Sequence, residues 1–208
     1  MRKVICVSGL SGVGKTTLCN ILSQNLDVMH IVVDEIYKQT PFCCPNEFKQ
    51  IYGQLSNAEN IKQTLSLIKD GTVEKEMEYF TAVFSTVNSM IMKISEDFMQ
   101  SDKRFLLLDW SAIAQTDLWK TADYKILVYS AKLQRHNALM EREIKKYHSF
   151  RSDLINVRDQ IYGDAVKVAE KDANIILHNN YDASFYDYIK QISERIFKNR
   201  KNVETGNK

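Results

Sequence analysis

The segment Gly9–Thr16, with the sequence GLSGVGKT, constrains the fold of this chain more than any other feature. It follows Val4–Ser8, a short run of mostly β-favouring residues, and it precedes 15–26, where the pattern predicts a helix. Apolar residues share one face of that helix: Leu18, Ile21, Leu22 and Leu26. Between a strand and a helix, the spacing GxxxxGK[ST] is typical of a loop that binds phosphate.

Each residue type in this loop has a physical task in holding a nucleotide. Glycines let the backbone approach closely, so that successive N–H groups can point at phosphate oxygens, and the helix adds its positive end. Lys15 would reach the β and γ phosphates, and the Thr16 hydroxyl would bind Mg²⁺. The sequence therefore predicts ATP bound by Gly9, Ser11, Gly12, Val13, Gly14, Lys15, Thr16 and Thr17. The alternative is a glycine turn with an incidental lysine.

Two carboxylates follow later predicted strands. Asp109 closes the nearly all-apolar run 104–109, and Asp34 follows the short strand 30–33. Ligands of parallel sheets lie beyond the carboxyl ends of the strands, so we expect Asp109 near Mg²⁺. Asp34 is expected next to the phosphate-loop strand, as in a common arrangement of such folds, where it could accept the proton of an attacking hydroxyl. The alternative for Asp109 is a cap on the next segment, and Glu35 competes with Asp34.

A basic stretch lies between two further predicted strands, 125–129 and 174–177. Phosphoryl transfer needs positive charge around the transferred group, and a closing lid can supply it. The candidates are Arg135, Arg142, Lys145, Lys146, Arg151 and Arg158. Arg142 is the first choice, although any one of them alone is more often a solvated surface charge.

A long apolar stripe predicts a helix that begins near Val73 and packs on the core. Its residues recur at steps of three or four: Met77, Phe80, Phe84, Val87, Ile91, Ile94 and Phe98. Strands that alternate with helices predict a parallel sheet with right-handed crossovers. The length of 208 residues, with 44% hydrophobic and 26% charged residues, fits one compact domain.

Other features argue against several classes of protein. The longest apolar runs are too short to cross a membrane and no secretory signal is visible, so we expect a cytoplasmic protein without a membrane partner. The cysteines, Cys6, Cys19, Cys43 and Cys44, match neither a zinc framework nor a redox pair. The basic C-terminal residues lack interleaved aromatics, so no nucleic-acid partner is expected. No obligate protein partner is predicted.

Over nearly the whole chain, the sequence resembles the dephospho-CoA kinase family, which phosphorylates the ribose 3′-hydroxyl of dephospho-CoA. The matching segments are GLSGVGKT, AspGluIle at 34–36, MetGluArgGlu at 140–143 and AlaAsnIleIleLeuHisAsnAsn at 173–180. The resemblance implies one α/β domain, 1–208, with the three-layer fold of P-loop NTPases. It implies a five-stranded parallel sheet, a helical acceptor-binding region at about 38–100 and a lid at about 135–160.

The resemblance also implies roles for individual residues. Asp34 would be the general base, Arg142 a lid arginine on the phosphates, and the loop around Asn179 part of the adenine pocket. Lys15 would act on the phosphates of ATP, with Thr16 and Asp109 at Mg²⁺. The implied partner is a small molecule, dephospho-CoA or a related nucleotide.

The acceptor side departs from the family pattern. Val32, Val33 and Asp34 stand in place of Asp-Ala-Asp, 88–91 in place of His-Pro-x-Ile, and 111–115 in place of Pro-Leu-Leu-x-Glu. Two alternatives therefore stay open. One is a nucleoside or nucleotide kinase of the same fold, and the other is a nucleotide-binding switch without catalysis.

Overall fold

The computed structural model describes residues 1–34, 73–148 and 152–197, and these contain a five-stranded parallel sheet. The strand order is β2-β3-β1-β4-β5, and every neighbouring pair is parallel. The strands are β1 Lys3–Ser8, β2 Val28–Val32, β3 Phe105–Asp109, β4 Tyr124–Tyr129 and β5 Ile175–His178. The predicted parallel sheet of five strands is confirmed.

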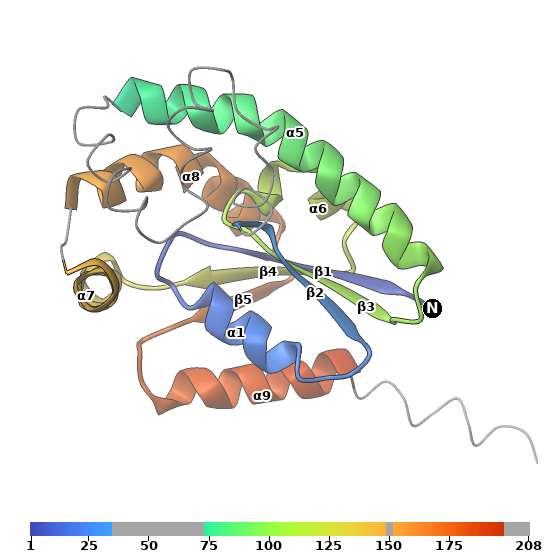
Figure 1. The fold of residues 1–208 in the computed structure, drawn as a ribbon. Coiled ribbons are helices and arrows are strands. Elements are labelled where there is room, and N and C mark those ends of the chain that lie inside the picture. Colours follow the sequence, from blue (N-terminus) through green and yellow to red (C-terminus); the bar gives the residue numbers. More distant parts are fainter. Residues whose placement is uncertain (35–72, 149–151, 198–208) are drawn as a thin grey trace, which may run out of the picture.

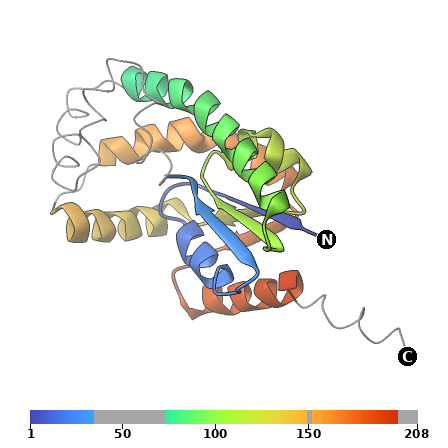
Figure 2. The ribbon, with the colours of Figure 1, turned by 45° about the vertical axis from the view of Figure 1, so that its right-hand side comes forward.

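Helices cover both faces of the sheet, so the fold has three layers (Figure 1). The described helices are α1 Lys15–Leu22, α5 Val73–Gln100, η2 Ile113–Gln115, α6 Asp117–Thr121, α7 Lys132–Tyr147, α8 Ser152–Asp172 and α9 Ala183–Phe197. α5, α6 and α8 lie on one face, and α1 and α9 lie on the other. α7 lies beyond the end of the sheet opposite to the N-terminus in both views (Figure 2). It is therefore close to the carboxyl ends of the strands.

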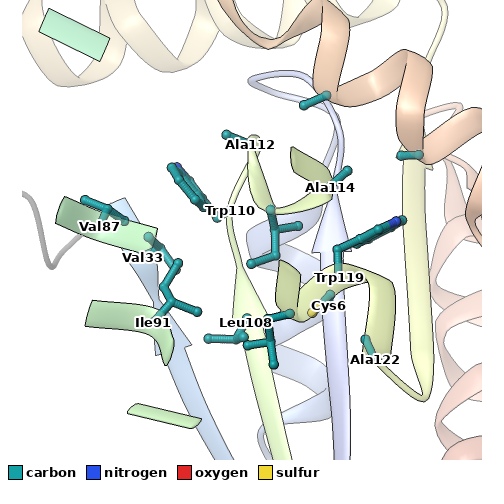
Figure 3. Packing of buried hydrophobic residues seen from close by; sticks show 14 of the residues in the cluster. Cys6, Val33, Val87, Ile91, Leu108, Trp110, Ala112, Ala114, Trp119 and Ala122 are labelled. Atoms are coloured by element: carbon teal, nitrogen blue, oxygen red, sulfur yellow. The ribbon is translucent and has the colours of Figure 1, made fainter. Parts of the chain in front are cut away.

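Side-chain alternation along the strands divides the interior into two cores. Ile5 and Val7 of β1 face α1 and α9, whereas Cys6 faces α5 and α8. β3 alternates in the same way, and all five of its residues are buried. Figure 3 shows the core on the α5 side, where Trp110 and Trp119 are among the largest fully buried side chains. A strand that is apolar on both faces belongs in the middle of such a sheet.

The predicted long helix is confirmed as α5, which extends from Val73 to Gln100. Val87, Ile91 and Phe98 from its apolar stripe are fully buried, and Phe84 stacks on Trp110 with ring centroids 5.5 Å apart. The side chains of Met77 and Phe80 lie outside the described residues, as does 35–72, most of the predicted acceptor-binding region. Among the described residues, no helix combines the length and apolar composition needed to cross a membrane.

The structure corrects one prediction about the sheet. β2 does not lie beside β1, because β3 pairs with both of them. β3 takes this inner position because its sequence is nearly all apolar, and its residues are buried there, whereas β2 is mostly half-buried and forms the edge. The strand that leads to Asp34 is thus one strand further from the phosphate loop than predicted.

Two element boundaries also differ from the prediction. α1 ends at Leu22, and Leu26 lies beyond it with its side chain exposed instead of on the buried helical face. Ser23 caps the helix, and its N–H donates to the carbonyls of Cys19 and Ile21. β2 spans 28–32 instead of 30–33, so Asp34 follows the strand after one intervening residue, Val33.

Candidate active site

The loop between β1 and α1 has a backbone that side chains would disrupt. Gly9 has φ 144°, and a Cβ built on it would lie 2.3 Å from the carbonyl oxygen of Val128 in β4. Gly14 has φ 100°, and its Cβ would lie 2.6 Å from Nδ2 of Asn179. Both contacts are far shorter than van der Waals distance, so glycine is required at each position. The loop is therefore packed tightly against the ends of β4 and β5.

Carbonyl groups of four successive loop residues, 10 to 13, each accept a hydrogen bond from a side chain. The donors, in order, are Lys15 at 3.0 Å, Arg135 at 3.1 Å, Tyr181 at 2.6 Å and Asn179 at 2.9 Å. A peptide N–H points away from its carbonyl, so holding the carbonyls favours N–H groups directed at the opposite side of the loop. These four side chains hold the loop in shape for an anion.

Arg135 in α7 connects the loop to two helices. Its side chain is only 2% exposed, it forms an ion pair with Asp159 of α8, and it donates to the carbonyl of Ser11. The sequence placed Arg135 among the basic residues of a lid. Its guanidinium lies inside the protein, where the carboxylate of Asp159 and a loop carbonyl fix it, and the lid itself stays a prediction.

Replacing Arg135 with alanine is expected to lower the free energy of unfolding by about 3–5 kcal/mol, since the carboxylate of Asp159 would lose its partner. Arg142→Ala is the matched control in the same helix, because Arg142 is 53% exposed and pairs with Glu143 at 2.7 Å. Its loss should change stability by less than about 0.5 kcal/mol. Chemical denaturation of both variants measures the difference, and equal losses would contradict a structural role of Arg135.

Asn179 and Tyr181 form the wall of the loop on the β5 side. The side chain of Asn179 is buried, and its Oδ1 accepts from the N–H of Tyr181 at 2.7 Å. Tyr181 has φ 59°, in the left-handed region, and burial raises the pKa of its hydroxyl. Tyr181 was not among the residues predicted from the sequence, although its place just after a parallel strand was a usable signal. The contact between the Asn179 loop and adenine stays a prediction.

Thr16 and Asp109 come together at the helix end of the loop. The Thr16 hydroxyl donates to Oδ2 of Asp109 at 2.9 Å, and Asp109 ends β3 in register with Val7 and Val32. Asp109 is only 4% exposed. Hydroxyl and carboxylate oxygens are ligands that Mg²⁺ prefers, so the two residues fit that ion. Thr17 is the next residue in the first turn of α1.

Lys15 is the electrostatic centre of these residues. Its side chain is buried, and burial lowers the pKa of its ammonium group, while Asp109 and Asp34 oppose that shift. Arg142 acts in the same direction as burial. Charges influence each other in this way only at short range, so the fold brings Lys15, Asp34, Asp109 and Arg142 to one region.

Asp34 lies at the carboxyl edge of the sheet, on the far side of Asp109 from the phosphate loop. It is exposed, and it follows β2 two residues after Val32, which is in register with Asp109. Glu35, the competing carboxylate, lies outside the described residues, and so does Arg151. Asp34 is thus an exposed carboxylate that acts on the charge of Lys15.

Comparison with known proteins shows what the fold is. No protein-family model and no curated protein sequence matches the chain. Among solved structures, TT1252 from Thermus thermophilus has a TM-score of 0.60 at 14% identity, covering 94% of this chain and 98% of that one. Shikimate kinase from Acinetobacter baumannii, in complex with shikimate, has a TM-score of 0.56 at 13% identity, covering 97% and 96%.

Dephospho-CoA kinase from Campylobacter jejuni also has a TM-score of 0.56, at 16% identity, and the match covers 95% of this chain and 98% of that one. These likenesses extend over almost the whole of each chain. The predicted α/β fold of P-loop kinases is therefore confirmed, and the resemblance to dephospho-CoA kinase holds at the level of the fold.

Proposed function

We propose that this protein is a kinase that transfers the γ-phosphate of ATP to a hydroxyl of a small molecule. The observation that carries the proposal is the phosphate loop held by four side chains, with the Thr16–Asp109 pair at its helix end. Asp109 and Asp34 both act on the charge of the buried Lys15 in this loop. A protein that only bound nucleotide would need no carboxylate there. The fold shared with two kinases supports the same reaction class.

Each residue then has a separate task. The loop N–H groups and Lys15 bind the phosphates, and Thr16 and Asp109 would hold Mg²⁺. Bound magnesium neutralises charge on the β and γ oxygens. Asp34 accepts the proton of the acceptor hydroxyl, and Arg142 stabilises the charge that spreads over the transferred group. Arg135, Tyr181 and Asn179 keep the loop in position from outside.

The leading acceptor is dephospho-CoA, which would be phosphorylated at the ribose 3′-hydroxyl to give coenzyme A. The support is the sequence resemblance in GLSGVGKT, 34–36, 140–143 and 173–180. A nucleoside or nucleotide is the competing acceptor. Likenesses to a shikimate kinase and a dephospho-CoA kinase have the same TM-score, 0.56, so the fold does not choose between acceptors.

A coupled assay of ADP release separates these possibilities. Dephospho-CoA, shikimate, nucleosides and nucleoside monophosphates are offered in turn, with ATP and Mg²⁺, and the product is identified by mass. We expect turnover with dephospho-CoA and a product of the mass of coenzyme A. Turnover with another acceptor alone would replace the substrate and keep the reaction class. ATP binding without turnover on any acceptor would favour a nucleotide-binding switch.

Arg142→Ala is expected to lower turnover by about 10- to 100-fold, the equivalent of one charge-assisted hydrogen bond. ATP affinity should change much less, because the interaction forms mainly in the transition state. Steady-state kinetics and calorimetry with ATP measure the two effects. Unchanged turnover would transfer the role to Lys146, Arg151 or Arg158.

A further inference from the structure

Three side chains with metal-binding atoms meet beside the phosphate loop, although they are far apart in the sequence. They are Cys19 in α1, His30 in β2 and Asp109 at the end of β3, and their ligand atoms all lie within 4.8 Å of one another. Each comes from a different element of the fold. The spacing of cysteines in the sequence could not show this cluster, because it contains only one of them.

One of the three groups lacks the hydrogen bonds that buried polar atoms normally have. Nε2 of His30 is buried and has no hydrogen-bond partner among the described residues. Cys19 is fully buried with a free thiol. Leaving a buried donor or acceptor unpaired costs about 1–3 kcal/mol, so such an atom requires an explanation. A ligand bound between these groups would satisfy it.

The chemistry of the three groups selects the ligand. A thiolate, an imidazole and a carboxylate are a set that Zn²⁺ binds, whereas Mg²⁺ avoids sulfur and takes oxygen. Tetrahedral zinc with bonds of about 2.0–2.3 Å holds its ligand atoms roughly 3.3–3.6 Å apart. Separations of up to 4.8 Å exceed this spacing by about 1.2–1.5 Å, so the three side chains would have to move toward the ion on binding.

We propose that Cys19, His30 and Asp109 form a binding site for a thiophilic divalent cation, and that the cation is zinc. Binding forms a sulfur–metal bond in place of the S–H bond of Cys19, and the proton passes to the buffer. Burial raises the pKa of the Cys19 thiol, so the metal has to displace its proton. Once it has done so, the thiolate and the Asp109 carboxylate supply two negative charges for the cation, beside the positive charge of Lys15. The metal completes its coordination with water.

Asp109 connects this site to the nucleotide site. Its carboxylate accepts from Thr16 and is the proposed magnesium ligand, so zinc on the same carboxylate opposes binding of ATP with Mg²⁺. This antagonism rests on the proposed function, whereas zinc binding itself does not. The cluster would thus make nucleotide binding sensitive to zinc.

Cobalt titration of the full-length protein under reducing conditions tests the site directly. Co²⁺ reports thiolate ligation by a sulfur-to-metal charge-transfer band in the near ultraviolet, and Zn²⁺ should abolish the band by displacement. Wild type and the double variant Cys43→Ser/Cys44→Ser should both show it at one Co²⁺ per chain. Cys19→Ala should lose it, and His30→Gln should weaken Co²⁺ binding at least tenfold.

Several outcomes would overturn the site. These are no band in wild type, a band that survives in Cys19→Ala, or a band lost in the double variant. If Cys19→Ala does not fold, as judged by circular dichroism, His30→Gln decides alone, and unchanged cobalt affinity in it rejects the site.

Calorimetry then measures ATP affinity with and without zinc, and zinc should weaken it in wild type but not in His30→Gln. Because the cobalt band needs no turnover, failure of the kinase proposal would not affect it.

Discussion

Lys15→Ala is expected to reduce phosphoryl transfer on the order of 10³-fold while the fold stays intact. The ammonium group of Lys15 donates to the carbonyl of Leu10 at 3.0 Å, and its charged neighbours are Asp109, Asp34 and Arg142. It therefore contacts the site and not the apolar core. On binding ATP, the side chain would exchange the carbonyl for phosphate oxygens, so its loss should weaken ATP binding as well as turnover.

Electrostatics explains why the fold should tolerate this change. Burial is the main cause that lowers the pKa of Lys15, so the charged group is held at a cost in free energy. Removing it relieves that cost, while Asp109 keeps its hydrogen bond from Thr16. Lys120→Ala is a suitable control, since Lys120 is exposed and pairs only locally with Asp117.

ADP release and thermal unfolding of wild type, Lys15→Ala and Lys120→Ala check the prediction. Lys15→Ala should lose activity at nearly unchanged stability, and Lys120→Ala should keep both. Retained activity in Lys15→Ala would contradict the role, particularly with a stability loss of about 2–5 kcal/mol, the size expected for truncation of a large core side chain.

Local signals in the sequence were sufficient for the fold class. A short window of consecutive residues was enough to predict several elements. These are the strand before Gly9, the apolar run that ends at Asp109 and the apolar stripe of α5. The order of the strands is not local information. β2 was expected next to β1, yet β3 lies between them. The nearly all-apolar character of β3 was the signal that it takes an inner position.

The residues of the candidate site also fall into two groups, those that local sequence could identify and those that it could not. The phosphate loop is one continuous motif, so its residues could be named from the sequence. Arg135 and Arg142 lie in one helix and have the same chemistry, but Arg135 is buried against Asp159 of the next helix, whereas Arg142 is exposed and pairs with its neighbour Glu143. Tyr181 reaches Gly12 across 169 positions of sequence. Contacts between distant segments decide these roles, and residue spacing does not encode them.

Asp34→Asn tests the mechanism most directly, because it keeps the size of the side chain and removes its ability to take up a proton. General-base assistance contributes about 10²- to 10⁴-fold, so turnover should fall by that factor. ATP affinity should stay within a few-fold, because the phosphate loop and Lys15 provide it. Asp34 is exposed, so little stability should be lost.

The competing role for Asp34 is to position magnesium, which its electrostatic effect on Lys15 also permits. In that case affinity for ATP with Mg²⁺ would weaken together with turnover, and added Mg²⁺ would restore part of the activity. Asp109→Asn is the matched comparison, since Asp109 already contacts Thr16 and should show this magnesium-dependent behaviour. The measurement pairs ATP calorimetry with ADP release across a magnesium series for both variants. A low turnover in Asp34→Asn that magnesium does not restore, at normal ATP affinity, is the expected result; near-normal turnover would reject Asp34 as the base and direct attention to Glu35.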